Sequence, residues 1–203
     1  RWRTLAALPN GARVGTSSLR RQMQIRALRP DLELVNVRGN VQTRLARASE
    51  DCDAVVLAHA GLLRLGLAEA ATEILEPERC LPAIGQGALA IEIRQDDPDI
   101  APIVARLDHA ETRAAVTAER ALLARLEGGC QVPIAGHAVV SGDALRLDGI
   151  VGAPDGSRVL TVRREGSIRD AERIGREAAE ALLDRGAKEI LDALADAKVG
   201  VPH

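Results

Sequence analysis

The first half of the chain alternates short apolar runs with segments in which apolar residues recur at helical spacing. Strands are expected at 13–15, 32–37 and 54–58, and the last (AVVLA) is a continuous apolar run of the kind that a parallel sheet buries on both faces. Helices are expected after them, at 19–28, 41–48 and about 60–67. This alternation predicts a parallel or mixed sheet covered by helices.

The periodicity changes between residues 82 and 127. Residues 82–87 (PAIGQG) interrupt it, and 88–94 (ALAIEIR) are expected to form a further strand before a polar connection at 95–99. Residues 110–127 have the amphipathic pattern of a long helix, which Gly128 and Gly129 end. This stretch therefore predicts one strand and one long helix without the earlier alternation.

The last third of the chain has the pattern of a small antiparallel sheet. Strand-like runs lie close together at 134–140, 144–151 and 158–164, with turn residues between them at 141–143 (SGD) and 154–156 (PDG). Two helices are expected after the strands, at about 169–184 and 187–195. The prediction is an α+β module, in which helices cover one face of a three-stranded antiparallel sheet.

These patterns together predict an α/β protein in two main parts. Residues 1–86 are expected to form an α/β domain similar to half of a periplasmic binding protein, with a parallel or mixed sheet. Residues 109–203 are expected to form the C-terminal α+β domain, and residues 87–108 connect the two.

Composition narrows the classes of function. Hydrophobic residues make up 46% of the 203 residues and charged residues 28%, as in ordinary soluble proteins. Neither an apolar run of about 18 residues nor a secretory leader is present, so we expect a cytoplasmic protein without a membrane partner. The net charge of −2 and the single aromatic residue, Trp2, argue against nucleic-acid binding. Because residue 1 is Arg rather than Met, we expect a truncated chain.

The cysteines and histidines do not have the spacing of a metal site. Cysteines stand at 52, 80 and 130 and histidines at 59, 109, 137 and 203. No CxxC pair occurs, so zinc and redox-pair chemistry are not expected, and a reducing compartment fits. Cys52 and Cys80 are interpreted as small buried hydrophobic residues.

The run GTSSLRR at 15–21 is the first candidate site. A strand leads into Gly15, three hydroxyl residues (Thr16, Ser17 and Ser18) follow, and a helix then begins with Arg20 and Arg21 in its first turn. Free N–H groups at a helix start and hydroxyl donors favour an anion. The alternative, a serine N-cap followed by two solvated arginines, fits the spacing equally well.

Three further arginines, Arg38, Arg44 and Arg64, each follow a predicted strand. Parallel α/β sheets place their ligand crevice at that end, and a guanidinium presents a rigid fork for carboxylates. Taken singly, each of them is explained by chance, because only Lys188 and Lys198 among the 27 basic residues are lysines. Together with Arg20 and Arg21 they predict a basic cleft for a ligand with several carboxylates.

Cys130, in the run LEGGCQVPI at 126–134, is interpreted as a working thiol. Two glycines precede it, it follows a helix end, and Pro133 stiffens the chain after it. A thiol near an arginine-rich cleft has its thiolate favoured. No His–Asp pair stands at a protease-like position, so a covalent role need not indicate a hydrolase.

These runs make the chain resemble the porphobilinogen deaminase (hydroxymethylbilane synthase) family. The matching runs occur in the family's order over about residues 11–195, and they are GTSSLRR (15–21), VRGNVQTRL (37–45), AGLLRLGL (60–67), LPAIGQGALAIE (81–92), TAERALLARLEGGCQVPI (117–134) and VGAPDG (151–156). GTSSLRR and EGGCQVP are the most distinctive of them.

The resemblance implies a cytoplasmic, monomeric transferase of porphyrin and heme biosynthesis. Such an enzyme joins four porphobilinogen molecules, releases ammonia each time, and then releases hydroxymethylbilane. It builds the chain on a dipyrromethane cofactor held through a thioether, and Cys130 matches the cofactor cysteine. The residues that match the family's cofactor and substrate cleft are Thr16, Ser17, Ser18, Arg20, Arg21, Arg38, Arg44 and Arg64.

One departure from the family concerns its first domain, which supplies the catalytic aspartate. No matching segment exists here, so no catalytic residue is expected in this chain, and residues 87–108 are interpreted as a return segment of that missing domain. The apolar run ALAIEI would then expose a strand edge, and the chain alone is expected to be inactive. Two alternatives stay open: a non-catalytic anion-binding module, which has no use for a thiol at Cys130, and a degenerate fragment.

Overall fold

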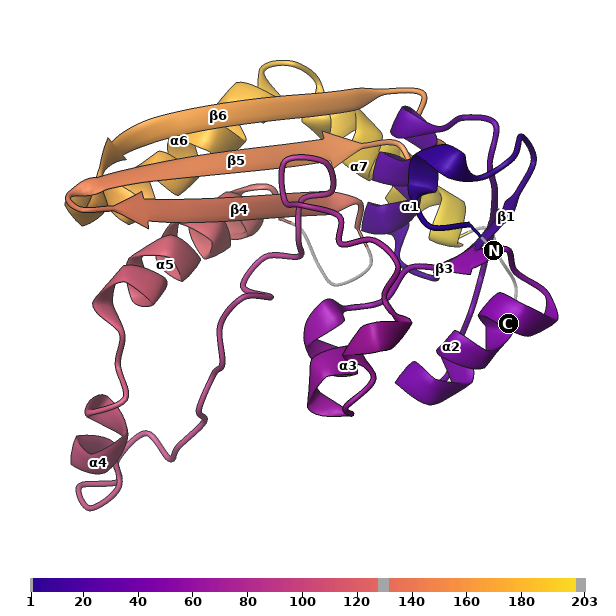
Figure 1. The fold of residues 1–203 in the computed structure, drawn as a ribbon. Coiled ribbons are helices and arrows are strands. Elements are labelled where there is room, and N and C mark those ends of the chain that lie inside the picture. The colour runs from indigo at the N-terminus through magenta and orange to yellow at the C-terminus, as the bar shows by residue number, and fades with distance from the viewer. Residues whose placement is uncertain (1, 128–131, 200–203) are drawn as a thin grey trace. The chain divides into compact units, whose positions relative to one another are not determined.

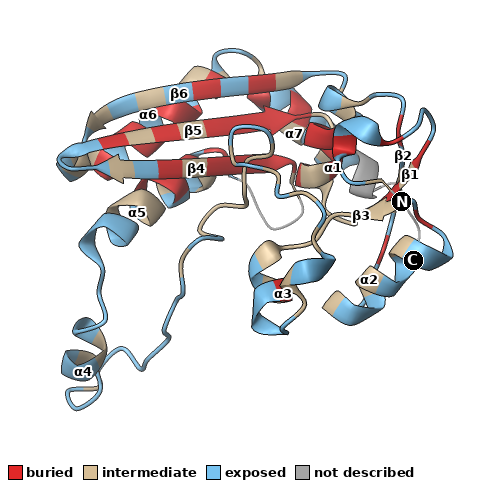
Figure 2. Cartoon of the chain, in the orientation of Figure 1, coloured by how far each residue is buried: buried red, intermediate tan, exposed pale blue. Residues whose placement is uncertain are grey.

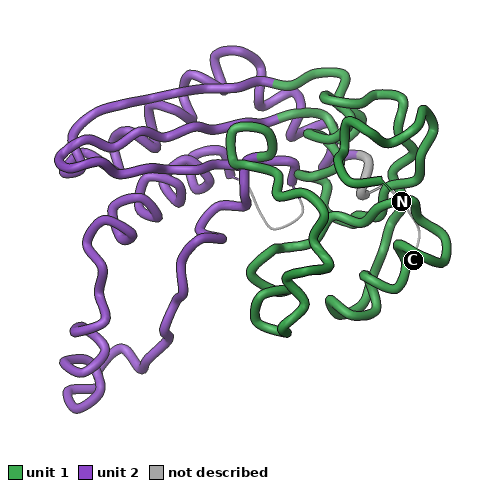
Figure 3. The backbone as a smooth tube through the Cα atoms, viewed as in Figure 1, with its two compact units in different colours: residues 1–80, 152–159 green, residues 81–151, 160–203 purple. Residues whose placement is uncertain are grey.

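The computed structural model describes residues 2–127 and 132–199, with side chains for all of these except 197–199. The chain divides into two compact units (Figure 3). Unit 1 contains residues 1–80 and 152–159, and unit 2 contains residues 81–151 and 160–203. A division by compactness does not test the domain boundaries predicted at 86/87 and 108/109, which stay a prediction.

Unit 1 is built on a parallel sheet of three short strands in the order β2-β1-β3. The strands are β1 (Arg13–Gly15), β2 (Glu33–Val35) and β3 (Ala54–Val55). The helices are α1 (Leu19–Leu28), α2 (Val41–Glu50) and α3 (His59–Arg64), with single 3-10 turns η1 (Leu5–Ala7) and η2 (Ala68–Ala70). Val14, in the central strand, pairs with both Leu34 and Ala54. The predicted parallel sheet with intervening helices is confirmed.

The core of unit 1 surrounds the central strand. Val14 and Ile25 are completely buried, and Leu5, Leu8, Ala12 and Leu32 complete the cluster. Burying a side chain of this size stabilises the fold by about 1.5–3 kcal/mol. Residues 152–159, which join two strands of unit 2, also pack in this unit, where Arg26 donates to the carbonyl oxygen of Pro154 at 3.0 Å.

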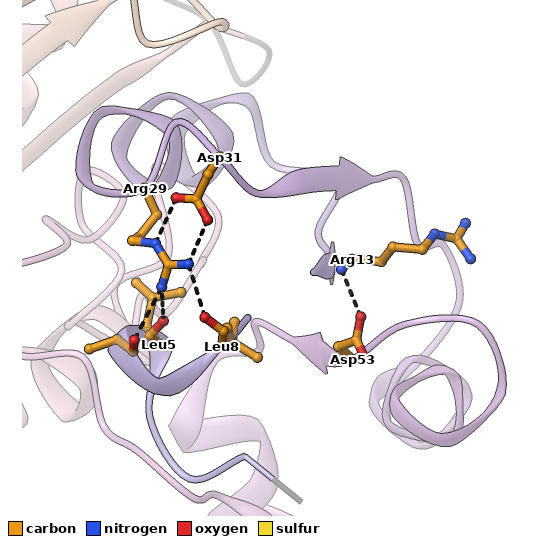
Figure 4. A network of polar contacts seen from close by, with 7 residues as sticks. Leu5, Leu8, Arg13, Arg29, Asp31 and Asp53 are labelled. Carbon is orange, nitrogen blue, oxygen red and sulfur yellow. Dashed lines mark hydrogen bonds and ion pairs between the residues drawn. The ribbon is translucent and has the colours of Figure 1, made fainter. Parts of the chain in front are cut away.

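A polar network braces the N-terminal turn η1 (Figure 4). The Arg29 guanidinium forms a two-pronged ion pair with Asp31, at 2.7 and 2.6 Å. The same side chain donates to the carbonyl oxygens of Leu5 and Leu8, at 2.9 and 3.0 Å. These carbonyls lie at the ends of a turn too short to satisfy them internally, so Arg29 replaces the missing helical partners.

Unit 2 contains a three-stranded antiparallel sheet in the order β4-β5-β6, as predicted (Figure 1). The strands are β4 (Ile134–Ser141), β5 (Ala144–Gly152) and β6 (Val159–Ser167). The helical elements are α4 (Ala101–Ala105), α5 (Ala110–Arg125), η3 (Ile168–Asp170), α6 (Ala171–Leu183) and α7 (Ala187–Val199). Leu145 and Leu147 of β5 are buried on the helix side, whereas Arg146 and Asp148 alternate onto the opposite face.

Small residues let helix α5 pack closely in unit 2. Gly136 and Gly149 are paired across β4 and β5, and the side chain of Leu122 fills the hollow over them. On α6, a Cβ added at Gly175 would lie 2.2 Å from the carbonyl oxygen of Ala118. Helix α5 is therefore held between a glycine pair on the sheet and a glycine on the neighbouring helix.

The strand predicted at 88–94 is wrong, because these residues form no regular element in the structure. Figure 2 shows the segment from there to α4 as exposed, and Leu89, Ile91 and Ile93 are 100%, 54% and 37% exposed. A strand needs a neighbour for its backbone hydrogen bonds, and the described residues offer this segment none. Its apolar pattern therefore lacks the partner that would make it a strand.

Candidate anion-binding site

The loop between β1 and α1 carries the three hydroxyl residues. The Thr16 amide donates to the carbonyl oxygen of Val35 at 2.8 Å, which continues the pairing of β1 with β2. The Ser17 hydroxyl donates to the carbonyl oxygen of Val37 at 2.6 Å, and the Ser18 amide donates to the Thr16 hydroxyl at 3.3 Å. These bonds hold the loop against the C-terminal end of β2, which is where parallel sheets bind ligands.

Ser18 stands at the N-cap of α1, but its side chain makes no capping hydrogen bond. The first turn of α1 therefore has no side-chain acceptor from its own N-cap. Its backbone N–H groups carry the partial positive charge of a helix start, which suits an anion.

In that first turn Arg20 is buried and Arg21 is partly buried. Arg20 is only 8% exposed, and its pKa is lowered to about 10, mainly by burial and then by the charge of Arg21. Burial also lowers the pKa of Arg21, whose guanidinium donates to the carbonyl oxygen of Val56 at 3.0 Å. Both side chains remain charged at neutral pH, so the unit holds two partly desolvated cations side by side.

Arg44 is the third arginine that the structure brings into this group. It lies half-buried on α2, donates to the carbonyl oxygen of Gly39 at 2.7 Å, and its charge lowers the pKa of Arg21. Asn40 begins this helix by accepting from the Thr43 amide at 2.8 Å. Arg44 thus belongs to an ordered helix start rather than to a mobile loop.

Arg38 and Arg64 differ from the other three arginines. Both are exposed, Arg38 after β2 and Arg64 at the end of α3. Their assignment to the same cleft stays a prediction.

Cys80 is a neighbour of the arginine pair that the sequence pattern missed. It is partly buried, and burial raises the pKa of its thiol, while the charges of Arg20 and Arg21 act in the opposite direction. No spacing rule links residue 80 to residues 20 and 21, so only the fold reveals this contact. Cys52, by contrast, is buried beside Gly15, as expected for a small hydrophobic residue.

Three neighbouring arginines give this site positive charge. The charge of Arg21 lowers the pKa of Arg20, and the charge of Arg44 lowers the pKa of Arg21. Positive charge in a partly desolvated setting, next to a helix start, binds carboxylates or phosphates strongly. The arrangement is suited to holding an anion with more than one acidic group.

Cys130, the predicted covalent residue, lies outside the described residues, which stop at Glu127 and resume at Val132. Glu127, the last described residue before it, has a φ of 53°, an uncommon conformation for a residue other than glycine. Pro133, on the other side, is fully buried. The described chain therefore has an uncommon backbone conformation before Cys130 and a buried proline after it.

The described residues contain no group of three or more His, Cys, Asp or Glu side chains that could hold a metal ion. Among the helices so described, none combines the length and the apolar character needed to cross a membrane.

Comparison with known families gives two matches along the chain. Residues 1–102 match the family described as "Porphobilinogen deaminase, dipyromethane cofactor binding domain". Residues 113–184 match "Porphobilinogen deaminase, C-terminal domain". The first match contains all the arginines and hydroxyl residues of the candidate site, and the second contains Cys130.

Curated relatives agree with these matches. The chain is 55% identical over 194 residues to a porphobilinogen deaminase of Nitratidesulfovibrio vulgaris, covering 95% of this chain and 62% of the relative. It is 53% identical to those of Trichlorobacter lovleyi, over 93% of this chain and 61% of the relative, and Roseiflexus castenholzii, over 93% and 62%. The chain therefore spans about three fifths of the length of these relatives.

Proposed function

The chain belongs to the porphobilinogen deaminase family, and from this premise we propose that it contributes the cofactor-binding part of a hydroxymethylbilane synthase. The reaction would join four porphobilinogen molecules into hydroxymethylbilane with release of ammonia. The observation that carries the proposal is the group of neighbouring arginines: Arg20 is buried, Arg21 is partly buried beside it, and the charge of Arg44 acts on Arg21. The alternative of a non-catalytic anion-binding module is not favoured by the family match.

The residues present fit a dipyrromethane cofactor. Each pyrrole unit carries two carboxylates, so the cofactor and the growing chain accumulate negative charge. Arg20, Arg21 and Arg44 would bind those carboxylates, and the Thr16 and Ser17 hydroxyls would help to shape the loop beside them. When bound, the cofactor supplies the primer to which the units are added.

Within this proposal the arginines act by positioning and charge. A buried guanidinium is fixed before the ligand arrives, so little side-chain entropy is lost on binding. Partial desolvation strengthens each ion pair relative to water. Cys130 would hold the cofactor through a thioether, which keeps the primer in place between successive additions.

The catalytic aspartate, by the same proposal, belongs to a part of the relatives that this chain does not match. The exposed segment 88–107 would pair with that part, because it carries large unpaired hydrophobic side chains at Leu89, Ile91, Ile103 and Leu107. The chain by itself would then bind the cofactor's carboxylates without completing the reaction.

The location and the oligomeric state of the protein are part of the same proposal. A cytoplasmic location fits three cysteines that stand far apart, at 52, 80 and 130, and form no CxxC pair. A monomeric state of the complete enzyme follows from the family resemblance alone. Light scattering on the complete enzyme would test the second, and a stable dimer would contradict it.

The covalent cofactor provides the experiment that tests the proposed function. The chain is produced together with the unmatched region of a relative, and its intact mass and its colour with an aldehyde reagent for pyrroles are measured. We expect a mass increase of one dipyrromethane and a positive colour, both abolished in Cys130→Ser and retained in the matched control Cys52→Ser. An unmodified mass in the wild type, with no colour, would argue against a synthase.

A further inference from the structure

A buried carboxylate stands in unit 2, away from the arginine group. Glu119 lies on α5 and is 6% exposed. One of its oxygens accepts from the Gly85 amide at 2.6 Å and the other accepts from the Ala138 amide at 2.9 Å. A buried acid is costly unless it is well hydrogen-bonded, so a group in this position calls for an explanation.

One of these two partners, Ala138, belongs to the free edge of the antiparallel sheet. Among the described residues, β4 pairs with β5 on one side, and no strand lies along its other side. Along that edge, the Gly136 amide donates to the carbonyl oxygen of Pro82 at 3.3 Å, and the Ala138 amide donates to Glu119. Glu119 and the chain at Pro82 together close an edge that would otherwise be open to pairing.

The other partner, Gly85, belongs to the loop 82–86. Within this loop the Gln86 amide donates to the carbonyl oxygen of Ala83 at 2.9 Å, and Gly85 turns the chain with a φ of 69°. The side chain of Ile84 packs over Gly136. The loop is thus joined to β4 by one backbone bond, one apolar contact and the carboxylate of Glu119.

Burial and three neighbouring groups act on the carboxyl group of Glu119 in opposite directions. Burial raises its pKa, and the two backbone amides and the charge of His137, on β4, act in the opposite direction. The loop 81–87 contributes no titratable group, and α6 meets α5 through Gly175 near Ala118 and Ala121. Both oxygens accept at once, which an ionised carboxylate does best and an amide side chain cannot do at all.

We propose that Glu119 is a positioning residue that latches the loop 82–86 onto the free edge of β4 and so sets the point at which the exposed segment 88–107 leaves unit 2. The loop is anchored through Pro82, Ile84 and Gly85, whereas from Gly87 onward the segment is exposed almost throughout. Glu119 is the charged member of that anchor. The proposal stands on contacts within unit 2 and does not depend on the proposed function, although in a synthase the latch would direct the segment toward its partner.

Amide NMR and hydrogen exchange on the chain test this latch. The Gly85 and Ala138 amides should titrate with one common midpoint, because both are bonded to the same carboxylate. In Glu119→Gln that shared titration should disappear, and exchange of these two amides should become at least about tenfold faster, since one amide would then face an NH₂ group. Exchange in α6 should stay unchanged. Glu111→Gln, an exposed glutamate on the same helix, is the matched control and should behave like the wild type.

A second variant approaches the latch from the loop. Gly85→Ala leaves Glu119 intact but places a side chain at a positive φ. It should therefore speed up exchange of the same two amides and leave exchange in α6 unchanged. Separate midpoints for the two amides would overturn the proposal. Equal acceleration throughout α6 in Glu119→Gln would also overturn it, because Glu119 would then support the whole unit rather than the loop.

Discussion

At the scale of single residues, burial decides what the charged side chains of this protein do. Arg20, Arg21 and Glu119 have the formal charges of many surface residues in the chain, but each is withdrawn from water and each has a shifted pKa. The arginines lie beside one another, whereas the glutamate is satisfied by two backbone amides. Neighbouring, partly desolvated cations favour the binding of an anion, and a fully bonded carboxylate holds protein structure.

Removing one guanidinium from the arginine group should weaken anion binding. We expect Arg20→Met to lower the affinity for mellitate, a benzene hexacarboxylate used as a probe, by about 10- to 100-fold, the loss of one charge-assisted hydrogen bond of about 1.5–3 kcal/mol. Isothermal titration calorimetry at low salt measures it. The exposed arginine Arg176, on α6, provides the control Arg176→Met, which should bind as the wild type does. Equal affinities in both variants would show that Arg20 does not face the ligand.

At the scale of elements, the close approach of helices α5 and α6 matters more than the helix propensity of the residue between them. Helix α5 carries Glu119 and Leu122 toward the sheet and meets α6 at Gly175. Helix propensity alone would favour alanine over glycine by about 1 kcal/mol in mid-helix. Gly175 is therefore retained for space, because α5 and α6 approach too closely there for a methyl group.

Gly175→Ala should consequently destabilise unit 2 despite its better propensity. The added Cβ would lie 2.2 Å from the carbonyl oxygen of Ala118 and 2.6 Å from the Cβ of Ala121, so the two helices must separate. We expect a loss of about 1–3 kcal/mol in the free energy of unfolding, measured by urea denaturation. Gly87→Ala is the matched control, because an added Cβ there meets nothing within 4 Å. A Gly175→Ala variant as stable as Gly87→Ala would contradict the packing argument.

At the scale of the whole molecule, the segment 88–107 sets the chain apart from a self-sufficient fold. Leu89, Ile91, Ile103 and Leu107 are all more than half exposed, and the described residues do not cover them. Large apolar side chains in an unpaired extended segment promote association between chains. Under the proposed function, the segment is therefore expected to behave differently in this chain alone and in a synthase that includes the unmatched region.

A single charge in this segment should have opposite effects in those two settings. Ile91→Lys should reduce self-association of the chain alone, measured by light scattering at increasing concentration, because it interrupts the exposed apolar run. In a protein completed with the unmatched region of a relative, the same change should lower synthase activity. Ile74→Lys is the control, since Ile74 is equally exposed, at 54%, but lies outside the segment. Equal effects of the two changes would show that the segment has no special partner.

Local patterns along the chain determined most of the secondary structure and led to the family. The alternation of strand and helix in the first half, and the three strands with two helices in the last third, are present in the structure, and the runs around Arg20 and Cys130 led to the family. Periodicity and turn residues are local properties, so they can be read before the chain is folded. The same local argument failed at 88–94, where the apolar pattern is present but a neighbouring strand is not.

Only the tertiary structure decided which of these residues act together. It buried Arg20 and partly buried Arg21, brought Cys80 near enough for its pKa to respond to both, and joined Glu119 to amides 34 and 19 residues away. Burial, hydrogen-bond partners and pKa values depend on residues distant in the chain, and no short pattern encodes them. Sequence therefore specified the elements and the chemical types at the site, whereas the fold selected the partners that give those side chains their charge and position.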